Sequence, residues 1–313
     1  MSLQGLGRAA IYVALIGSAA VGPAIAMEGG AGFYLLGSRT SQAGILPPPG
    51  LYFQNDLYFF SGGVDLSVPI PSGNFVLGGL DATVVFELPT LLWSTPVEVL
   101  GGNLGLGLTV PIGYKDVEAS LGGLGVEDAI TAFGDPVASA SIGWHSGNFH
   151  WQAVAALNIP IGQYDADQLA NIGFNRWALD LLAAGTWLDP SVGWEISGAL
   201  GLTINGNNPA TDYQSGNEAH FEWAVVKHFN QQFSAGAIGY VYQQVTPDSG
   251  SGASLGGFEG KAMGIGLTAA YSFLVDQHPV TASFKYLHDF NTENRIPGDG
   301  LFLTIATPIS MAE

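Results

Sequence analysis

The chain has 313 residues, of which 47% are hydrophobic and only 11% are charged, and its formal net charge is −18. Soluble domains usually carry about a quarter charged residues, so this composition argues against a water-soluble globule. Eight lysines and arginines cannot form the basic patch that neutralises nucleic-acid phosphates, and the absence of cysteine excludes disulfides, thiolate zinc sites and cysteine nucleophiles.

Residues 1–26 have the pattern of a secretory signal peptide. Arg8 precedes an apolar run from Ala9 to Ala20, and Ala24 and Ala26 provide the small residues of a cleavage site. A retained membrane anchor is the alternative, but the apolar run is shorter than the roughly 20 residues that a spanning helix needs. We therefore expect export and cleavage after Ala26.

Residues 27–50, here called the lead-in segment, do not alternate between polar and apolar side chains. The three prolines near its end lack backbone donors and have a fixed φ, so this segment cannot join a β-ladder. Either it folds into the lumen of a barrel or it is a loose periplasmic tail. We expect it to narrow the lumen with Leu46, Pro47, Pro48 and Pro49.

Residues 51–309 divide into about a dozen alternating stretches, with breaks that are long and short in turn. The long breaks lie near residues 62–78, 113–133, 162–173, 205–216, 246–258 and 291–299, and the short ones near 93–96, 146–148, 189–191, 229–232 and 276–278. Outer-membrane barrels have an even number of strands, long external loops and short periplasmic turns. The pattern predicts an all-β fold: a monomeric transmembrane antiparallel β-barrel of about 12 strands, with its N-terminus on the periplasmic side and residues 310–313 as a C-terminal overhang.

The alternation also predicts which side chains face the lumen. Along Glu195 to Asn205, polar or small residues occupy one parity and Trp194, Ile196 and Leu200 occupy the other. Successive strand residues point to opposite faces, so the apolar face should meet lipid. Charges in a membrane-spanning element mark a pathway or a structural ion-pair network. The candidate pore-lining residues are Gln152, Asn158, Arg176, Asp180, Glu195, Asn205, Glu218, His220, Glu222 and Lys285.

Aromatic residues cluster near the ends of the expected strands. They include residues 58–60, Trp93, Trp144, Trp187, Trp194, Tyr240 and Tyr242. Aromatic girdles mark both membrane interfaces of outer-membrane barrels, so we expect these residues to form such girdles. A soluble lipocalin-like barrel would have the opposite polarity, with an apolar inside.

Several short motifs, in order along the chain, resemble one family of outer-membrane proteins. They occupy residues 46–52, 133–136, 158–165, 171–177, 211–216 with His220, 239–240 with 243–246 and 248–250, and Phe290 with 293–295. The chain resembles the family named for the meta-pathway of phenol degradation. This resemblance implies an outer-membrane channel, associated with the degradation of aromatic compounds, that admits small hydrophobic molecules. The final residues, 308–313, differ from the terminal aromatic with which many such barrels end.

Two other classes of function are weighed against a channel. An outer-membrane hydrolase would need a serine–histidine pair, but none of the six histidines lies near a Gly-x-Ser-x-Gly elbow. A calcium site could use Asp165 with Asp167, or Asp128 with Asp135, although external loops rich in aspartate are ordinarily only solvated. We expect no catalytic residue, no metal and no cofactor.

The function expected from the sequence is passive uptake of small apolar or aromatic solutes through the outer membrane of a Gram-negative bacterium. The expected partners are these solutes, outer-membrane lipid and lipopolysaccharide, with no nucleic acid. The alternatives are an outer-membrane hydrolase and a sealed structural or adhesive barrel.

Overall fold

The computed structural model describes residues 27–69, 75–254 and 256–311. The expected signal peptide, residues 1–26, lies outside the described residues. A short 3₁₀ turn, η1 (Glu28–Gly30), precedes the first strand. The strands are β1 (Gly50–Pro69), β2 (Phe75–Val99), β3 (Gly102–Thr109), β4 (Ile112–Leu121), β5 (Leu124–Phe133), β6 (Val137–Ser146), β7 (Phe149–Asn158), β8 (Ala178–Asp189), β9 (Trp194–Asn205), β10 (Asn207–Asn208), β11 (Tyr213–Gln214), β12 (Glu218–His228), β13 (Phe233–Gln244), β14 (Lys261–Val275), β15 (His278–Glu293) and β16 (Gly298–Met311).

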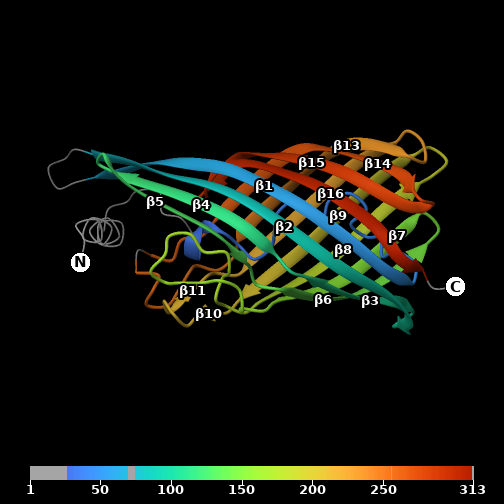
Figure 1. Ribbon diagram of the computed structural model, residues 1–313, viewed down its shortest axis with the longest axis horizontal. Coiled ribbons are helices and arrows are strands. Elements are labelled where there is room, and N and C mark those ends of the chain that lie inside the picture. The colour runs from blue at the N-terminus through green and yellow to red at the C-terminus, as the bar shows by residue number, and fades with distance from the viewer. Residues whose placement is uncertain (1–26, 70–74, 255, 312–313) are drawn as a thin grey trace.

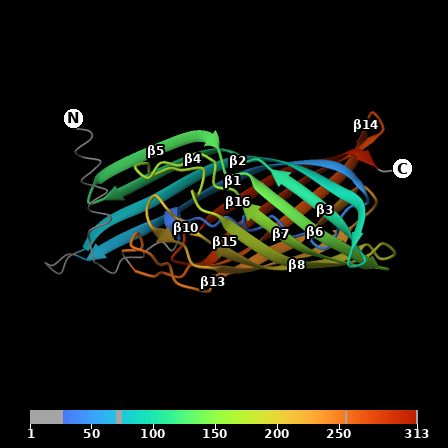
Figure 2. The ribbon, with the colours of Figure 1, turned by 90° about the horizontal axis from the view of Figure 1, so that it is seen from below.

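Twelve strands close into one antiparallel ring. The order is β1-β2-β3-β6-β7-β8-β9-β12-β13-β14-β15-β16, and β1 pairs with both β2 and β16 (Figures 1 and 2). Closure within one chain leaves no free edge in the ring, which is the condition for a sheet to cross a membrane. The predicted twelve-strand barrel is therefore confirmed. No helix among the described residues is long and apolar enough to cross a membrane.

The region from β2 to β6 differs from the expectation. The break expected at residues 93–96 is a bulge, where the register of β2 on β3 shifts between Ser94 and Glu98. The chain turns instead at Leu100 and Gly101, which both have positive φ. Pro96 cannot donate to the ladder, and the strand tolerates it at this irregularity.

The external loop expected at residues 113–133 is instead the hairpin β4–β5. β4 continues along β2 beyond β3, and β5 pairs with β4. β1 has 20 residues and β2 has 25, whereas a spanning strand needs roughly 9–11. In both views β1, β2, β4 and β5 project beyond the other strands at one end, the end that also carries β10 and β11 (Figures 1 and 2). This is the end of the long loops.

The two faces of the wall separate by polarity as predicted. On β9, Glu195 and Ala199 are at most 1% exposed, while Ile196 and Leu200 are 55% and 60% exposed. The exposed apolar side chains continue around the ring on the same outward parity. A wall that exposes leucine, isoleucine and tryptophan and buries glutamate is stable only with lipid outside, so the lipocalin-like alternative is wrong.

The aromatic residues do not all form girdles. Trp93 and Trp194 are outward and about half exposed, near the short turns. Tyr240 and Tyr242 instead point inward and are buried in a cluster with Met27 and Phe302. Both tyrosines occupy inward-facing positions in the alternation of β13, so they point into the lumen although they lie near the end of the strand.

The C-terminal strand is longer than expected. β16 runs to Met311, and Ser310 and Met311 pair with Leu51 and Gly50 of β1. Two residues of the expected overhang therefore complete the barrel seam.

A charge placed on the outward face tests the assignment of lipid-facing residues. Leu200→Arg, near the middle of β9, should lower the free energy of unfolding in vesicles by about 2–4 kcal/mol, because the guanidinium must enter hydrocarbon. Val192→Arg is the matched control, since Val192 is similarly exposed but lies in the turn between β8 and β9. Equal losses in both variants, measured by denaturant titration, would contradict the assignment.

Candidate functional site

The lead-in segment lies inside the barrel and runs from one end to the other. At the long-loop end the Met27 amide donates to Asp248 Oδ2 at 2.8 Å. Midway, the Gly44 amide donates to Thr186 Oγ1 at 2.9 Å. At the short-turn end, Ser94 Oγ donates to the Pro47 carbonyl at 2.7 Å. Met27 was expected on the periplasmic side, and these contacts place it at the opposite end.

The lead-in segment is formed of turns rather than a strand, so its amides need acceptors other than a β-ladder. Two buried carboxylates of the wall provide them. Glu222 accepts hydrogen bonds from the amides of Gly37 and Arg39, both at 2.7 Å. Glu195 accepts from the Gln42 amide at 2.7 Å and from Ser41 Oγ at 2.9 Å. Hydrogen bonds to a charged group are about twice as strong as neutral ones.

Two glycines let the lead-in segment approach the wall. Gly37 has a φ of 89°, and a Cβ there would collide with Leu287. A Cβ on Gly44 would lie 2.5 Å from the Thr186 nitrogen and 2.6 Å from the His150 carbonyl oxygen. At Gly37 the positive φ itself favours glycine, and at Gly44 the nearest atoms belong to the backbone of the wall, which cannot easily move aside.

Other predicted pore-lining residues also bind the lead-in segment. Gln152 Nε2 donates to the Ala43 carbonyl at 2.6 Å. Lys285 Nζ donates to the carbonyls of Gly37 and Ser38, and it lies 4.4 Å from the ring centre of Phe302. The wall thus provides both hydrogen-bond acceptors for the amides of the lead-in segment and hydrogen-bond donors for its carbonyls.

A third group of predicted residues forms a layer below the long loops. His220 Nε2 and Thr203 Oγ1 both contact Asp180 Oδ1, at 2.9 and 2.7 Å, and the His220 ring stacks on Tyr34 of the lead-in segment with 3.6 Å between ring centres. Arg176 lies just before β8, with its guanidinium 4.0 Å from the Glu28 carboxylate. The side-chain amides of the two asparagines are also paired: Asn205 Nδ2 donates to Glu218, and Asn158 Nδ2 donates to Asp135.

All ten predicted residues therefore face inward, but in this structure they hold the lead-in segment or one another. A role in lining a solute passage stays a prediction. The same holds for a constriction at Leu46, Pro47, Pro48 and Pro49, which lie at the short-turn end.

Among the described residues, two cavities lie between the lead-in segment, the wall and the long loops. The larger, of about 280 Å³, is lined by Leu80, Lys115, Val117 and Phe258 among others. The smaller, of about 170 Å³, is lined by several aromatic rings, with Lys115 and Arg295. These rings belong to Tyr34, Tyr58, Phe60, Phe86, Phe174 and Tyr240.

The sequence analysis missed the β4 part of this lining. Residues 113–133 were interpreted as a loop, although Gly113, Lys115, Val117 and Ala119 alternate with exposed polar residues. That period-two pattern was the signal that could have identified the strand.

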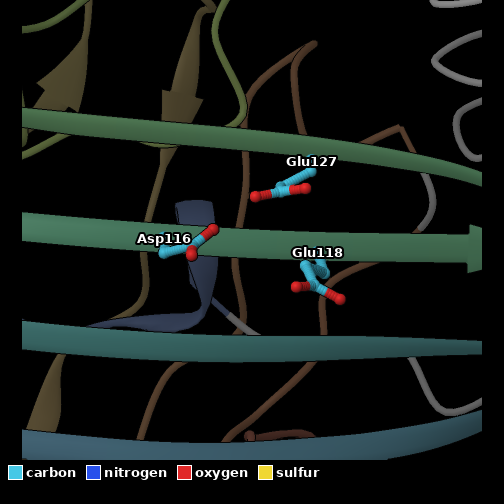
Figure 3. Close-up of side chains that lie close together, drawn as sticks. All are labelled: Asp116, Glu118 and Glu127. Carbon is cyan, nitrogen blue, oxygen red and sulfur yellow. The ribbon is translucent and has the colours of Figure 1, made fainter.

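The aspartates considered for calcium have structural partners. Asp135 accepts from the amides of Gly162 and Phe174, and Asp128 accepts from the amides of Leu169 and Ala170. These bonds fasten the loop after β7 to β5 and to the connection between β5 and β6. An acidic group on the outer face comprises Asp116, Glu118 and Glu127 from β4 and β5, with ligand atoms within 4.8 Å of one another (Figure 3). Exposed carboxylates are commonly arranged this way without an ion.

The comparisons with known proteins agree on the architecture. The family described as "Putative MetA-pathway of phenol degradation" matches residues 67–305. A COG4313 outer membrane channel from Pseudomonas putida F1 has a TM-score of 0.64 and 15% identity, over 88% of this chain and 99% of that chain. At this identity the likeness shows the fold.

Two autotransporter barrels are less similar. The β-domain of the Bordetella autotransporter BrkA has a TM-score of 0.48 and 11% identity, over 83% of this chain and 100% of that chain. The transport unit of AIDA-I from Escherichia coli has a TM-score of 0.45 and 9% identity, over 96% and 97% of the two chains. No curated protein matches this chain.

Removing one anchoring carboxylate should loosen the lead-in segment. Glu222→Ala leaves the amides of Gly37 and Arg39 without their acceptor, and each charge-assisted bond contributes about 1.5–3 kcal/mol. We expect the single-channel conductance in planar bilayers to rise severalfold. Glu118→Ala, which removes an exposed carboxylate from the outer face of β4, should leave the conductance unchanged. An unaltered conductance in folded Glu222→Ala protein would show that this contact does not hold the segment.

Proposed function

The chain belongs to the family of the MetA-pathway of phenol degradation, and we propose that it is an outer-membrane channel for passive uptake of small hydrophobic or aromatic compounds. The family assignment confirms the resemblance found in the sequence. The protein lies in the outer membrane of a Gram-negative bacterium and crosses it with twelve strands.

The observation that carries this proposal is the aromatic cavity inside the barrel. Its volume of about 170 Å³ is close to that of an engineered apolar cavity of about 150 Å³ that binds benzene. A sealed barrel needs no such space, because protein interiors otherwise pack at the density of organic crystals. The cavity is therefore of a size and chemistry to hold one small aromatic molecule.

The two cavities form a sequence from the loops inward. Both are lined by Gly30, Ala82, Lys115 and Ile296, so they adjoin along β2 and β4. The larger one also contacts Phe258 of the long loop before β14. A solute would enter below the loops, occupy the aromatic cavity and leave when the lead-in segment shifts.

A solute in the aromatic cavity could pass on through the lumen only if the lead-in segment moved. The segment is held by side-chain hydrogen bonds and ring stacking, and its described residues pair with no strand of the ring before Gly50. Such contacts break individually at modest cost compared with a β-ladder, which would open only as a unit. Transport therefore runs down a gradient with the segment as its gate.

The proposed partners follow from the outer surface. The ring closes within one chain, which supports a monomer, and its exposed apolar belt contacts outer-membrane lipid with lipopolysaccharide outside. We also propose that the protein is not an enzyme. Among the described residues, the hydrogen bonds of histidine rings go to Asp180, Glu195 and Asp299, and none joins a serine hydroxyl.

A sealed structural barrel is the second candidate. It is favoured by how completely the lead-in segment fills the lumen, with Met27, Ala43 and partly buried Tyr34 packed against wall side chains. The channel and the sealed barrel differ in whether solutes or ions pass through the lumen.

Filling the cavity tests the channel. Ala82 lines both cavities and is 7% exposed, so Ala82→Trp should lower uptake of radiolabelled toluene to the level of cells without the protein. Thr83→Trp places the same bulk on the outer face of the same strand and should leave uptake unchanged. If cells with folded wild-type protein take up toluene no faster than cells without it, and bilayers show no conductance, the barrel is sealed.

A further inference from the structure

Lys115 is an isolated cation on an otherwise apolar inner wall. It lies on β4 between Gly113 and Val117 of the same face and pairs across the ladder with Val84 of β2. It lines both cavities. No carboxylate among the described residues lies within 4.0 Å of it, and no hydrogen bond to a described residue satisfies it.

The other inward cations differ from Lys115 in their surroundings. Arg176 lies 4.0 Å from Glu28, and Lys285 donates to two carbonyls of the lead-in segment. Arg295, which lines the smaller cavity with Lys115, rests over the Tyr242 ring at 4.3 Å and is attracted by the charges of Glu218 and Asp289. Asp289, the carboxylate in the lining, is hydrogen-bonded to Tyr240 and to the Gly298 amide.

A charge at an apolar wall is costly unless water or an opposite charge accompanies it. The chain has only eight lysines and arginines, yet two of them border one small aromatic cavity. Aromatic rings to stack upon and the unpaired Lys115 ammonium are together complementary to a ligand with an aromatic ring and an anionic group.

Resting on the proposed function, we propose that the cavity selects aromatic carboxylates, with the ring against the side chains of Phe86 and Tyr58, which are opposite each other on β2 and β1, and the carboxylate at Lys115. Neutral aromatic molecules enter the same cavity but gain no ion pair. The site thus concentrates aromatic acids relative to hydrocarbons of the same size.

Uptake of radiolabelled benzoate, phenol and toluene by cells carrying Lys115→Met tests the proposal. Benzoate uptake should fall roughly tenfold, as expected for loss of one charge-assisted bond, while toluene uptake stays within about twofold of wild type. Lys115→Arg should retain most benzoate uptake. Lys227→Met, which removes a charge bound to the Val192 carbonyl near a short turn, is the matched control and should change nothing.

The outcomes separate this inference from the proposed function. Toluene uptake without any effect of Lys115→Met on benzoate would overturn the carboxylate site and leave the channel intact. An equal loss of phenol and benzoate would also overturn it, because a neutral acceptor would then suffice. Absence of uptake of all three compounds by wild type would instead refute the channel.

A second inference comes from the Met27–Asp248 contact and does not depend on the transported solute. Asp248 is 4% exposed and accepts four hydrogen bonds, from Met27, Gly216, Gln244 and Tyr213. Burial, together with this carboxylate, raises the pKa of Tyr213, so the phenol keeps its proton and donates. No cation among the described residues lies within 4.0 Å of Asp248.

The Met27 nitrogen, which donates to Asp248, is the atom that would become positively charged on signal-peptide cleavage. The sequence predicts cleavage after Ala26, and that hydrolysis converts the Met27 amide nitrogen into an α-ammonium group. The nitrogen lies 2.8 Å from Asp248 Oδ2, and Met27 itself is 2% exposed. We infer that signal-peptide removal creates a buried ion pair that locks the lead-in segment into the barrel.

A chain refolded from Met27 and one extended by Ser-Ala-Ala before Met27 separate the charge from the hydrogen bond. Trypsin cleavage after Arg39 reports release of the segment, and it should be roughly tenfold faster in the extended chain, where the Met27 nitrogen is a neutral amide and the ammonium is three residues away. In an Asp248→Asn background the extension should make no difference, because the charge partner is gone. The same rate difference in both backgrounds would overturn the ion pair and indicate steric displacement.

The proposed ion pair between Met27 and Asp248 also predicts how the difference between the two chains depends on pH. A carboxylate partner raises the α-amine pKa above its unfolded value of about 7.7–8.0, so the added stability is present below that range and is lost as pH rises through the folded value. The difference between the two chains should therefore disappear at high pH. A difference that persists unchanged to pH values well above the raised pKa would overturn the inference.

Discussion

A chain segment inside a closed barrel has no strand edge to pair with, and this constraint organises the whole lumen. Buried amides of the lead-in segment that do not bond within its own turns, such as those of Gly37, Arg39, Gln42 and Gly44, need acceptors from the side chains of the wall. Glu195 and Glu222 supply acceptors with full charge, while Gln152 and Lys285 supply donors to the carbonyls of the same segment. The inward charged residues that the sequence analysis assigned to a solute pathway therefore also hold the lead-in segment in the lumen through hydrogen bonds.

The size of the ring explains why a plug is present. Barrels of eight strands are filled by their own side chains, whereas 16–18 strands leave an aqueous channel. Twelve strands enclose a space that wall side chains do not fill, and the lead-in segment occupies most of it. The two cavities lie beside β2 and β4, where most inward side chains are apolar. Space suited to an apolar solute is thus left beside this part of the wall.

The sequence predicts the barrel and its two faces because a period of two depends only on neighbouring residues. It could not predict the partner of Glu222, since Gly37 is 185 residues distant and no local pattern links them. Two expected breaks were wrong: β4 and β5 form a hairpin where a loop was expected at residues 113–133, and β2 has a bulge where a turn was expected at residues 93–96. Tyr240 and Tyr242 were assigned to a girdle by their position near a strand end, but their side chains lie on the inner face.

Hydrogen exchange at the lead-in amides tests the central claim most directly. In the folded protein, the amides of Gly37, Arg39, Gln42 and Gly44 are bonded to Glu222, Glu195 and Thr186 of the wall. They should exchange far more slowly than in an unfolded peptide, and protection should be lost at Gly37 and Arg39 when Glu222 is replaced by alanine. Exchange of these amides at the rate of a free peptide, in a barrel whose strands remain protected, would contradict the account.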